Sequence, residues 1–143
     1  MLEAMVAGTQ VALEEYLKTV YRPDCDFVDG ELEERNVGEL SHGYLTSLLS
    51  WYFFQHQNEF HIVPISEWRT RVSGTRYRVP DLTLMRETFE PEAVLSKPPY
   101  VCIEILSPED RWSRMYYRLN DFLAAGAVIY GVSRDSLKSH ENF

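Results

Sequence analysis

Two carboxylates, Asp81 and Glu104, have the sequence surroundings expected of a buried acidic site. Glu104 lies inside a short apolar run at 101–106 that is rich in β-branched residues, which indicates a strand buried on both faces. Asp81 follows a proline and begins a second apolar run at 82–85. A carboxylate in a buried strand needs a cationic partner, a metal or a raised pKa. If the two runs are neighbouring strands, the carboxylates converge and form a candidate divalent-metal site with oxygen ligands.

The same residues allow an interpretation without a metal, in which Glu104 pairs with an arginine and Asp81 caps a turn. Arginines form two clusters in the chain: Arg69, Arg71, Arg76 and Arg78 around one turn, and Arg111, Arg114 and Arg118 on one later segment. Arginine suits bidentate phosphate contacts, but any single one of these residues can also lie on a solvated strand or helix face. The spacing alone leaves both interpretations open.

Length and composition indicate one globular domain. The 143 residues are 45% hydrophobic and 13% aromatic, enough for a core, so we treat 1–143 as a single domain with its core at about 25–133. The net charge of −8 argues against indiscriminate binding to nucleic acid. We find no membrane-spanning run, no signal-peptide pattern and no metal-ligand spacing of Cys25 and Cys102. We therefore expect a cytoplasmic protein with reduced thiols and no membrane partner.

Hydrophobic periodicity predicts the elements that position these residues. A helix at 10–19, with Thr9 as its N-cap, precedes a hairpin at 25–35 that turns at Asp29-Gly30. A longer helix is predicted at 41–58. The remaining predicted elements are strands at 61–65, 68–72, 77–85, 100–106 and 128–132, and a helix at 110–125 that starts at Ser107-Pro108 and ends before Gly126. We expect residues 61–72, 77–85, 100–106 and 128–132 to form one mixed sheet against the two long helices, with the last two strands parallel.

Four further residues are candidates for the site. Arg118 flanks the apolar stripe of the helix at 110–125, so we expect its guanidinium to reach toward Asp81 and Glu104. Glu31 lies on an acidic strand of the hairpin, His42 at the start of a helix, and Glu67 at a predicted bend. We interpret most acids of the hairpin, Glu33 among them, as solvated.

The order of elements, with Pro80-Asp81 on one strand and Glu104 on the next, resembles the restriction-endonuclease-like PD-(D/E)xK superfamily, and more narrowly the Uma-two family of endonuclease-like proteins. The matching pieces are Glu15-Tyr16-Leu17, Phe27-Val28-Asp29-Gly30-Glu31, Ser41-His42, Arg78-Val79-Pro80-Asp81, Pro98-Pro99, Ile103-Glu104-Ile105-Leu106-Ser107-Pro108 and 119–126. The resemblance covers about residues 11–132 and rests on the ordered set. It implies an α/β fold, a mixed central sheet flanked by helices with an α-β-β-β-α-β core, preceded by the N-terminal helix and hairpin.

The resemblance also implies a metal-dependent endonuclease that hydrolyses phosphodiester bonds in DNA. Asp81 and Glu104 would be the ligands of Mg²⁺ or Mn²⁺, and a homodimer is expected because cutting a duplex needs two sites. The superfamily places a lysine two residues after the second acid, where this chain has Leu106; the position matching the relocated lysine of Uma-two proteins is Arg118. Arginine keeps the charge but accepts protons poorly. The alternative is therefore a nuclease-fold binding module that has lost catalysis, and a third hypothesis is an unrelated α/β binding protein.

Convergence of the two acids would have a measurable consequence. Their mutual repulsion should raise at least one pKa in the absence of metal. On the sequence alone, both Asp81→Asn and Glu104→Gln should then melt higher than wild type in chelator, with Glu33→Gln as a neutral control.

Overall fold

The computed structural model describes residues 8–35, 40–106 and 112–133. In chain order its elements are α1 (Leu13–Lys18), β1 (Asp26–Val28), β2 (Glu31–Glu33), α2 (Leu40–Gln55), α3 (Gln57–Phe60), β3 (Ile62–Ser66), β4 (Thr70–Ser73), β5 (Arg76–Arg78), β6 (Leu82–Arg86), β7 (Val101–Ile105), α4 (Trp112–Ala124) and β8 (Val128–Val132). The strands form two sheets of four, with the orders β2-β1-β5-β4 and β3-β6-β7-β8.

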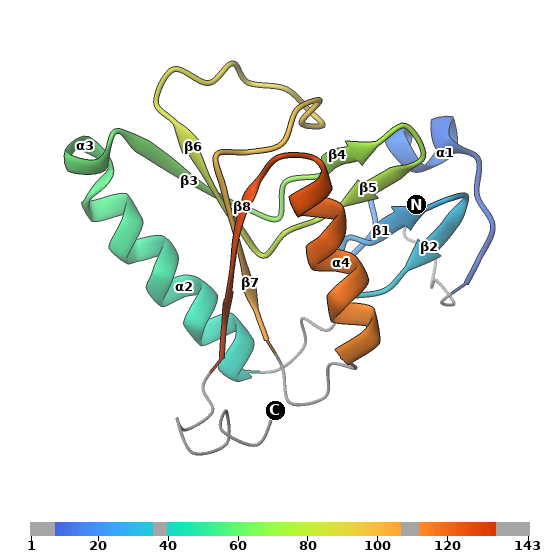
Figure 1. The fold of residues 1–143 in the computed structure, drawn as a ribbon, viewed down its shortest axis with the longest axis horizontal. Coiled ribbons are helices and arrows are strands. Elements are labelled where there is room, and N and C mark those ends of the chain that lie inside the picture. The colour runs from blue at the N-terminus through green and yellow to red at the C-terminus, as the bar shows by residue number, and fades with distance from the viewer. Residues whose placement is uncertain (1–7, 36–39, 107–111, 134–143) are drawn as a thin grey trace.

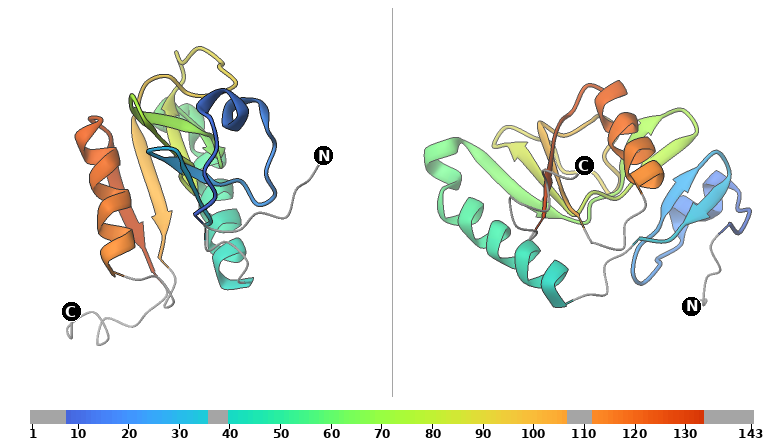
Figure 2. Two further views of the ribbon diagram at one scale, coloured as in Figure 1. Left: turned by 90° about the vertical axis from the view of Figure 1, so that its right-hand side faces the viewer. Right: turned by 60° about the horizontal axis from the view of Figure 1, so that its bottom comes forward.

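The sheet β3-β6-β7-β8 lies between the two long helices, with α2 on one face and α4 on the other (Figures 1 and 2). Alternation along β7 divides its side chains between these faces. Ile103 and Ile105 pack in the cluster that α2 completes, whereas Cys102 packs against Phe122 of α4. Glu104 alternates with the two isoleucines, so it lies on the α4 face of the sheet.

The second sheet and α1 enclose a separate aromatic cluster. Tyr16 of α1 is fully buried against Phe27 of β1 and Tyr77 of β5, with ring centroids 5.1 Å and 6.0 Å away. Figure 2 shows this unit beside α4 and the central sheet. It brings β1 and the end of β5 close to the α4 face.

The prediction of one mixed sheet from all the central strands was wrong. Residues 61–72 divide between the two sheets, because the chain turns at Glu67, whose φ of 52° is left-handed. Residues 77–85 also divide, because Val79, Pro80 and Asp81 cross from one sheet to the other. Pro80 has no N–H to donate to a ladder, which explains the break. Asp81 is therefore between strands and not inside one.

Other elements agree with the sequence more closely. The hairpin turns at Asp29-Gly30, with φ values of 51° and 95°, and β7 pairs in parallel with β8. Gly126, with φ 93°, follows α4 as predicted. The first helix begins only at Leu13, without a side-chain cap, because the residues before it run along β2: the carbonyl of Thr9 accepts the Leu32 N–H at 3.0 Å.

Further expectations concern the ends of helices, the thiols and the membrane. The predicted helix at 41–58 divides into α2 and α3, and the predicted start at Ser107-Pro108 lies outside the described residues. Cys25 and Cys102 are free and buried, in agreement with reduced thiols. In the described part of the chain, no helix combines the length and the apolar character needed to cross a membrane.

Candidate active site

Asp81 is buried at the point where the chain enters the central sheet. Only 4% of the residue is exposed, and the pairing of Leu82 with Ile103 places it opposite Glu104 on the neighbouring strand. Its Oδ2 accepts the Ile105 N–H at 2.7 Å. Its Oδ1 accepts a hydrogen bond from Arg35 Nη2 at 2.8 Å and lies 3.1 Å from His42 Nε2. Three elements thus converge on one carboxylate.

Glu104 is 6% exposed and faces α4, where Arg118 meets it. Arg118 Nε lies 3.2 Å from Oε2 and Nη2 lies 3.2 Å from Oε1, so the guanidinium contacts both carboxylate oxygens. Arg118 Nη2 also donates to the Val79 carbonyl, just before Asp81. The predicted orientation of Arg118 toward the two acids is therefore confirmed.

The two acids titrate in opposite directions. Burial alone would raise the pKa of Asp81, but the hydrogen bond from His42 and the charge of Arg35 together hold that pKa below its ordinary value. Burial, and then the charge of Asp81, raise the pKa of Glu104 well above its ordinary value, and a hydrogen bond between the two carboxyl groups adds to the effect. The two carboxyl groups therefore titrate as an interacting pair in which Glu104 is the weaker acid. The prediction that at least one of the two pKa values is raised agrees with the pKa of Glu104, whereas the pKa of Asp81 is lowered.

This asymmetry changes the expected effect of neutralising each acid. Glu104→Gln resembles the protonated form of Glu104 and removes the free-energy cost of ionising this buried side chain beside Asp81. Asp81→Asn instead removes the closer of the two carboxylates that pair with Arg35, whose side chain is only 3% exposed, so it should lower stability in chelator. We therefore keep the prediction of a higher Tm in chelator for Glu104→Gln alone.

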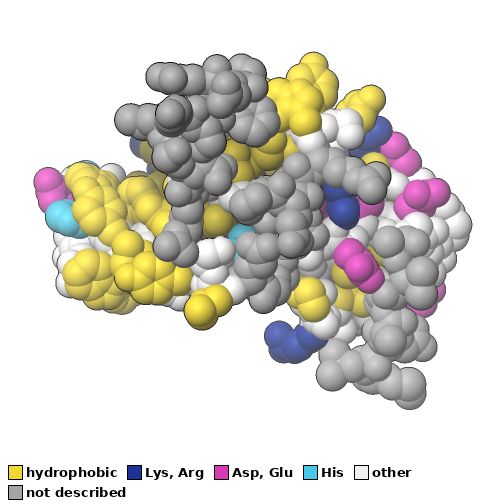
Figure 3. Space-filling model, turned by 90° about the horizontal axis from the view of Figure 1, so that it is seen from below, with side chains coloured by type: hydrophobic (Ala, Val, Ile, Leu, Met, Phe, Trp, Pro, Cys, Tyr) yellow, Lys and Arg dark blue, Asp and Glu magenta, His cyan; other side chains and the backbone are white. Residues whose placement is uncertain are grey.

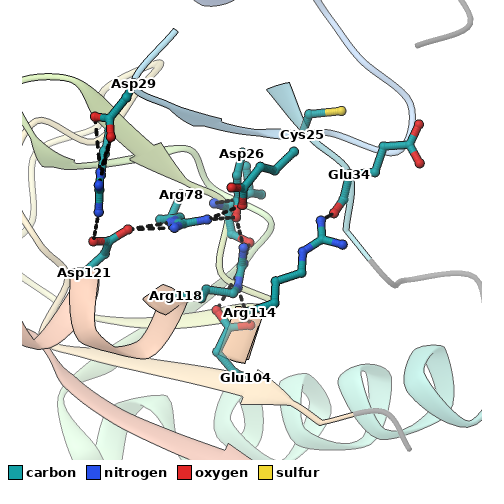
Figure 4. A network of polar contacts seen from close by, with 12 residues as sticks. Cys25, Asp26, Asp29, Glu34, Arg78, Glu104, Arg114, Arg118 and Asp121 are labelled. Carbon is teal, nitrogen blue, oxygen red and sulfur yellow. Dashed lines mark hydrogen bonds and ion pairs between the residues drawn. The ribbon is translucent and has the colours of Figure 1, made fainter. Parts of the chain in front are cut away.

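Asp26, which the sequence analysis did not single out, connects the hairpin to the site. It is 1% exposed, and its Oδ1 accepts the Val79 N–H at 2.7 Å. Its Oδ2 accepts hydrogen bonds from Arg78 Nη1, at 3.1 Å, and from Arg118 Nη1. Figure 4 shows Asp26 between these two guanidinium groups. Asp26 therefore fixes both the segment before Asp81 and the arginine that contacts Glu104.

Arg78 is held by acids on three elements. Besides Asp26, it contacts Asp121 of α4 at 2.7 Å (Figure 4). It also contacts Glu33 of β2 at 2.8 Å. The prediction that Glu33 is solvated was therefore wrong, because its carboxylate forms an ion pair with the buried Arg78. It is unsuitable as a neutral control.

The three weaker candidates have different outcomes. His42 is buried and contacts Asp81, as described above. Glu67 is half-exposed and lies 3.3 Å from Arg35, the residue that also pairs with Asp81. Glu67 therefore reaches the site only through Arg35. Glu31 is exposed and accepts a hydrogen bond from Gln10 at 2.8 Å, and the structure does not bring it to the site.

A small cavity of about 60 Å³ lies between the two acids and the arginines that contact them, with room for a few water molecules and too small for a nucleotide. Its lining comprises Asp26, Glu33, Glu34, Arg35, Arg78, Asp81, Glu104, Ile105, Leu106, Arg114, Met115, Arg118 and Leu119. Among the described residues, no group of three or more His, Cys, Asp or Glu side chains is arranged to hold a metal. A cation bound here would therefore have to be held by fewer than three such side chains and complete its coordination with water, as Mg²⁺ usually does.

The raised pKa of Glu104 predicts a specific pH dependence. The folded chain retains a proton that the unfolded chain releases, so stability is lost as pH rises above the unfolded pKa of this group. The glutamine of Glu104→Gln does not titrate, so this variant lacks that loss of stability. Its stability relative to wild type should increase with pH, by up to about 1.4 kcal/mol per unit. Urea denaturation between pH 5 and 8 measures this difference.

The matched control is Glu90→Gln, at an exposed position of the loop after β6. It should follow wild type at every pH. If Glu104→Gln instead loses stability relative to wild type as pH rises, Glu104 is ionised in the fold and Arg118 stabilises that charge.

The fold of this chain is restriction-endonuclease-like. A solved structure similar to this one is described as a "putative nuclease belonging to DUF820" from Anabaena variabilis ATCC 29413. It has a TM-score of 0.72 and 19% sequence identity over 86% of this chain and 74% of that chain, which shows the shared fold. The model of the Uma2 family, described as "Putative restriction endonuclease", matches residues 13–136. The chain belongs to the Uma2 family, and this membership supports a nuclease function and removes the hypothesis of an unrelated binding protein. No curated protein matches the chain.

Proposed function

We propose that this protein is a metal-dependent endonuclease that hydrolyses phosphodiester bonds in DNA, with Asp81 and Glu104 as the ligands of Mg²⁺ or Mn²⁺. The observation that supports this proposal most directly is the placement of two buried carboxylates opposite each other, Asp81 directly before β6 and Glu104 in β7, both lining one small cavity. Burying two acids together is unfavourable unless a cation compensates them. A site with that composition is suited to binding a cation.

The donor set fits a hard divalent cation, because both ligands are oxygens. Arginines already donate hydrogen bonds to the oxygens that would bind the cation. Arg35 donates to Oδ1 of Asp81, and Arg118 donates to both carboxylate oxygens of Glu104. Binding a cation therefore requires at least one guanidinium to move aside. When bound, the metal would polarise the phosphate and lower the pKa of an attacking water.

The arginines then become available for phosphate. Arg35 lines the cavity, and its Nε is buried with no hydrogen-bond partner among the described residues. Buried donors are normally satisfied, so a phosphate oxygen or a water is the acceptor that this group lacks. Arg118, whose pKa burial lowers to about 10, stays protonated at neutral pH and can stabilise the charge on a phosphate. Neither residue readily accepts a proton.

Cleavage of supercoiled plasmid tests the proposal. Wild type should nick or linearise the plasmid in Mg²⁺ or Mn²⁺ and not in chelator. Asp81→Asn should fall to background because it removes one of the two ligands. Glu90→Gln, remote from the cavity, should cleave like wild type. Cleavage that persists in chelator, or in Asp81→Asn, would show that these acids are not the site.

Metal binding can be measured without cleavage. A cation that binds only the folded chain should stabilise it by about 2.7 kcal/mol at a hundredfold excess over its Kd, and so raise Tm near neutral pH. The rise should be small in Asp81→Asn and Glu104→Gln and full in Glu90→Gln. Equal responses in all four proteins would place the ion elsewhere.

A second function, a nuclease-fold binding module without catalysis, is favoured by one observation. In the present geometry both oxygens of each acid are already occupied by protein donors, and the lysine position holds Arg118. In a binding module of this kind, Arg35 and Arg118 would neutralise the two acids in place of a metal ion. Such a protein would show neither cleavage nor a metal-induced rise in Tm.

A further inference from the structure

Helix α2 carries large hydrophobic side chains both toward the central sheet and on its opposite face. Its residues, Leu40–Gln55, include no Asp, Glu, Lys or Arg. Leu45, Leu49 and Phe53 pack against the central sheet, so one face of the helix is satisfied within the chain. A helix that is hydrophobic all round is normally covered on its other face as well. That face of α2 is exposed in the described part of the structure.

The open face displays large side chains. The exposed fractions are 90% for Leu40, 59% for Tyr44, 47% for Leu48, 60% for Trp51 and 61% for Phe54. Figure 3 shows hydrophobic side chains gathered at the end of the molecule formed by α2 and α3. With side-chain areas typical of these residue types, they expose roughly 600 Å². That is at the upper end for a single surface patch and approaches the roughly 800 Å² that each partner of a stable complex covers.

The spacing on this face suits a second helix of the same sequence. Leu40, Tyr44, Ser47, Trp51 and Phe54 are alternately four and three residues apart, the pattern of a seam between two packed helices. The pattern is nearly symmetric about Ser47. In an antiparallel pair, Leu40 of one copy lies opposite Phe54 of the other, and Tyr44 lies opposite Trp51. The small Ser47 at the centre allows the two backbones to approach.

We propose that two copies of this chain associate through α2, packed antiparallel about a twofold axis near Ser47. Self-complementarity of one patch is the property that a twofold interface requires. Electrostatics point to the same face, because each copy has a net charge of −8 and α2 is a long element free of charge. The two copies therefore meet where their mutual repulsion is least. The inference does not depend on nuclease activity, and either can fail without the other.

Crosslinking tests the position of the axis. Cys25 and Cys102 are buried, so an added surface cysteine is the reactive thiol. Ser47→Cys should form a covalent dimer with a short bis-maleimide at micromolar protein. Ser113→Cys, at an exposed position of α4, is the matched control and should remain largely monomeric. Equal crosslinking of the two variants would overturn the proposal.

Charge complementation tests the antiparallel pairing. Sedimentation should show a dimer for wild type, and more than about 30-fold weaker association for Tyr44→Lys or Trp51→Glu alone. Mixing these two variants should restore a heterodimer, because the introduced lysine of one copy then faces the introduced glutamate of the other. A mixture of Tyr44→Lys with Trp51→Lys should stay monomeric. A wild type that is monomeric at about 100 µM, where even a micromolar contact would be occupied, or failure of the first mixture to associate would refute the model.

Discussion

Replacing Asp26 with Asn is expected to lower the free energy of unfolding by about 3 kcal/mol, the cost typical of breaking a buried ion pair. The Asn carbonyl can still accept the Val79 N–H, but the amide group would direct its own N–H donors toward Arg78 and Arg118. Two buried guanidinium groups would then lack the carboxylate between them. For a domain of this size Tm should fall by roughly 10 °C, which calorimetry or circular dichroism measures.

Asp29→Asn provides the matched control for this prediction. Asp29 also pairs with an arginine, Arg76, at 2.8 Å, but both side chains are substantially exposed, at 51% and 34%. The exposed pair should contribute little, and Asn tolerates the left-handed φ of 51° at this turn. Asp29→Asn should therefore change stability by less than about 1 kcal/mol. If Asp26→Asn is equally mild, the network in Figure 4 does not hold the hairpin to the site.

The sequence predicted the parts of the site that depend on local pattern. The buried run around Glu104, the proline before Asp81 and the apolar stripe beside Arg118 each lie within a few residues of the group they position. Alternation in strands and helical periodicity translate such patterns into direction. The orientation of Arg118 toward Glu104 followed from this reasoning and is confirmed.

The missed part of the site depends on contacts between distant segments. Asp26 contacts Arg78 and Arg118, which are 52 and 92 residues away in the chain. No periodicity links such positions, and a single acid in a short strand resembles a solvated one. The division of the strands into two sheets has the same origin. Glu67 and Pro80 mark where the chain leaves one sheet for the other, but the second sheet is completed by the pairing of β1 with β5, a contact that local propensity does not describe.

The substitution expected to raise activity most is Arg118→Lys. An arginine at this position can stabilise negative charge, but it cannot take a proton from an attacking water. A buried lysine has its pKa lowered by desolvation and can accept that proton. General acid–base assistance is typically worth about 10²- to 10⁴-fold, so we expect plasmid cleavage by Arg118→Lys to exceed wild type by roughly 100-fold in Mg²⁺.

The pH profile distinguishes this explanation from a general loosening of the site. Cleavage by Arg118→Lys should rise with pH through the pKa of the new lysine, whereas wild type should lack that step. Arg71→Lys, at an exposed position of β4 outside the cavity lining, keeps a positive charge and should leave both rate and profile unchanged. If Arg118→Lys binds metal, shows the expected Tm rise and still does not cleave, the missing lysine is not what limits catalysis. If wild type cleaves faster than Arg118→Lys, Arg118 itself contributes charge stabilisation that the lysine cannot replace, since only the guanidinium contacts Glu104, Asp26 and the Val79 carbonyl together.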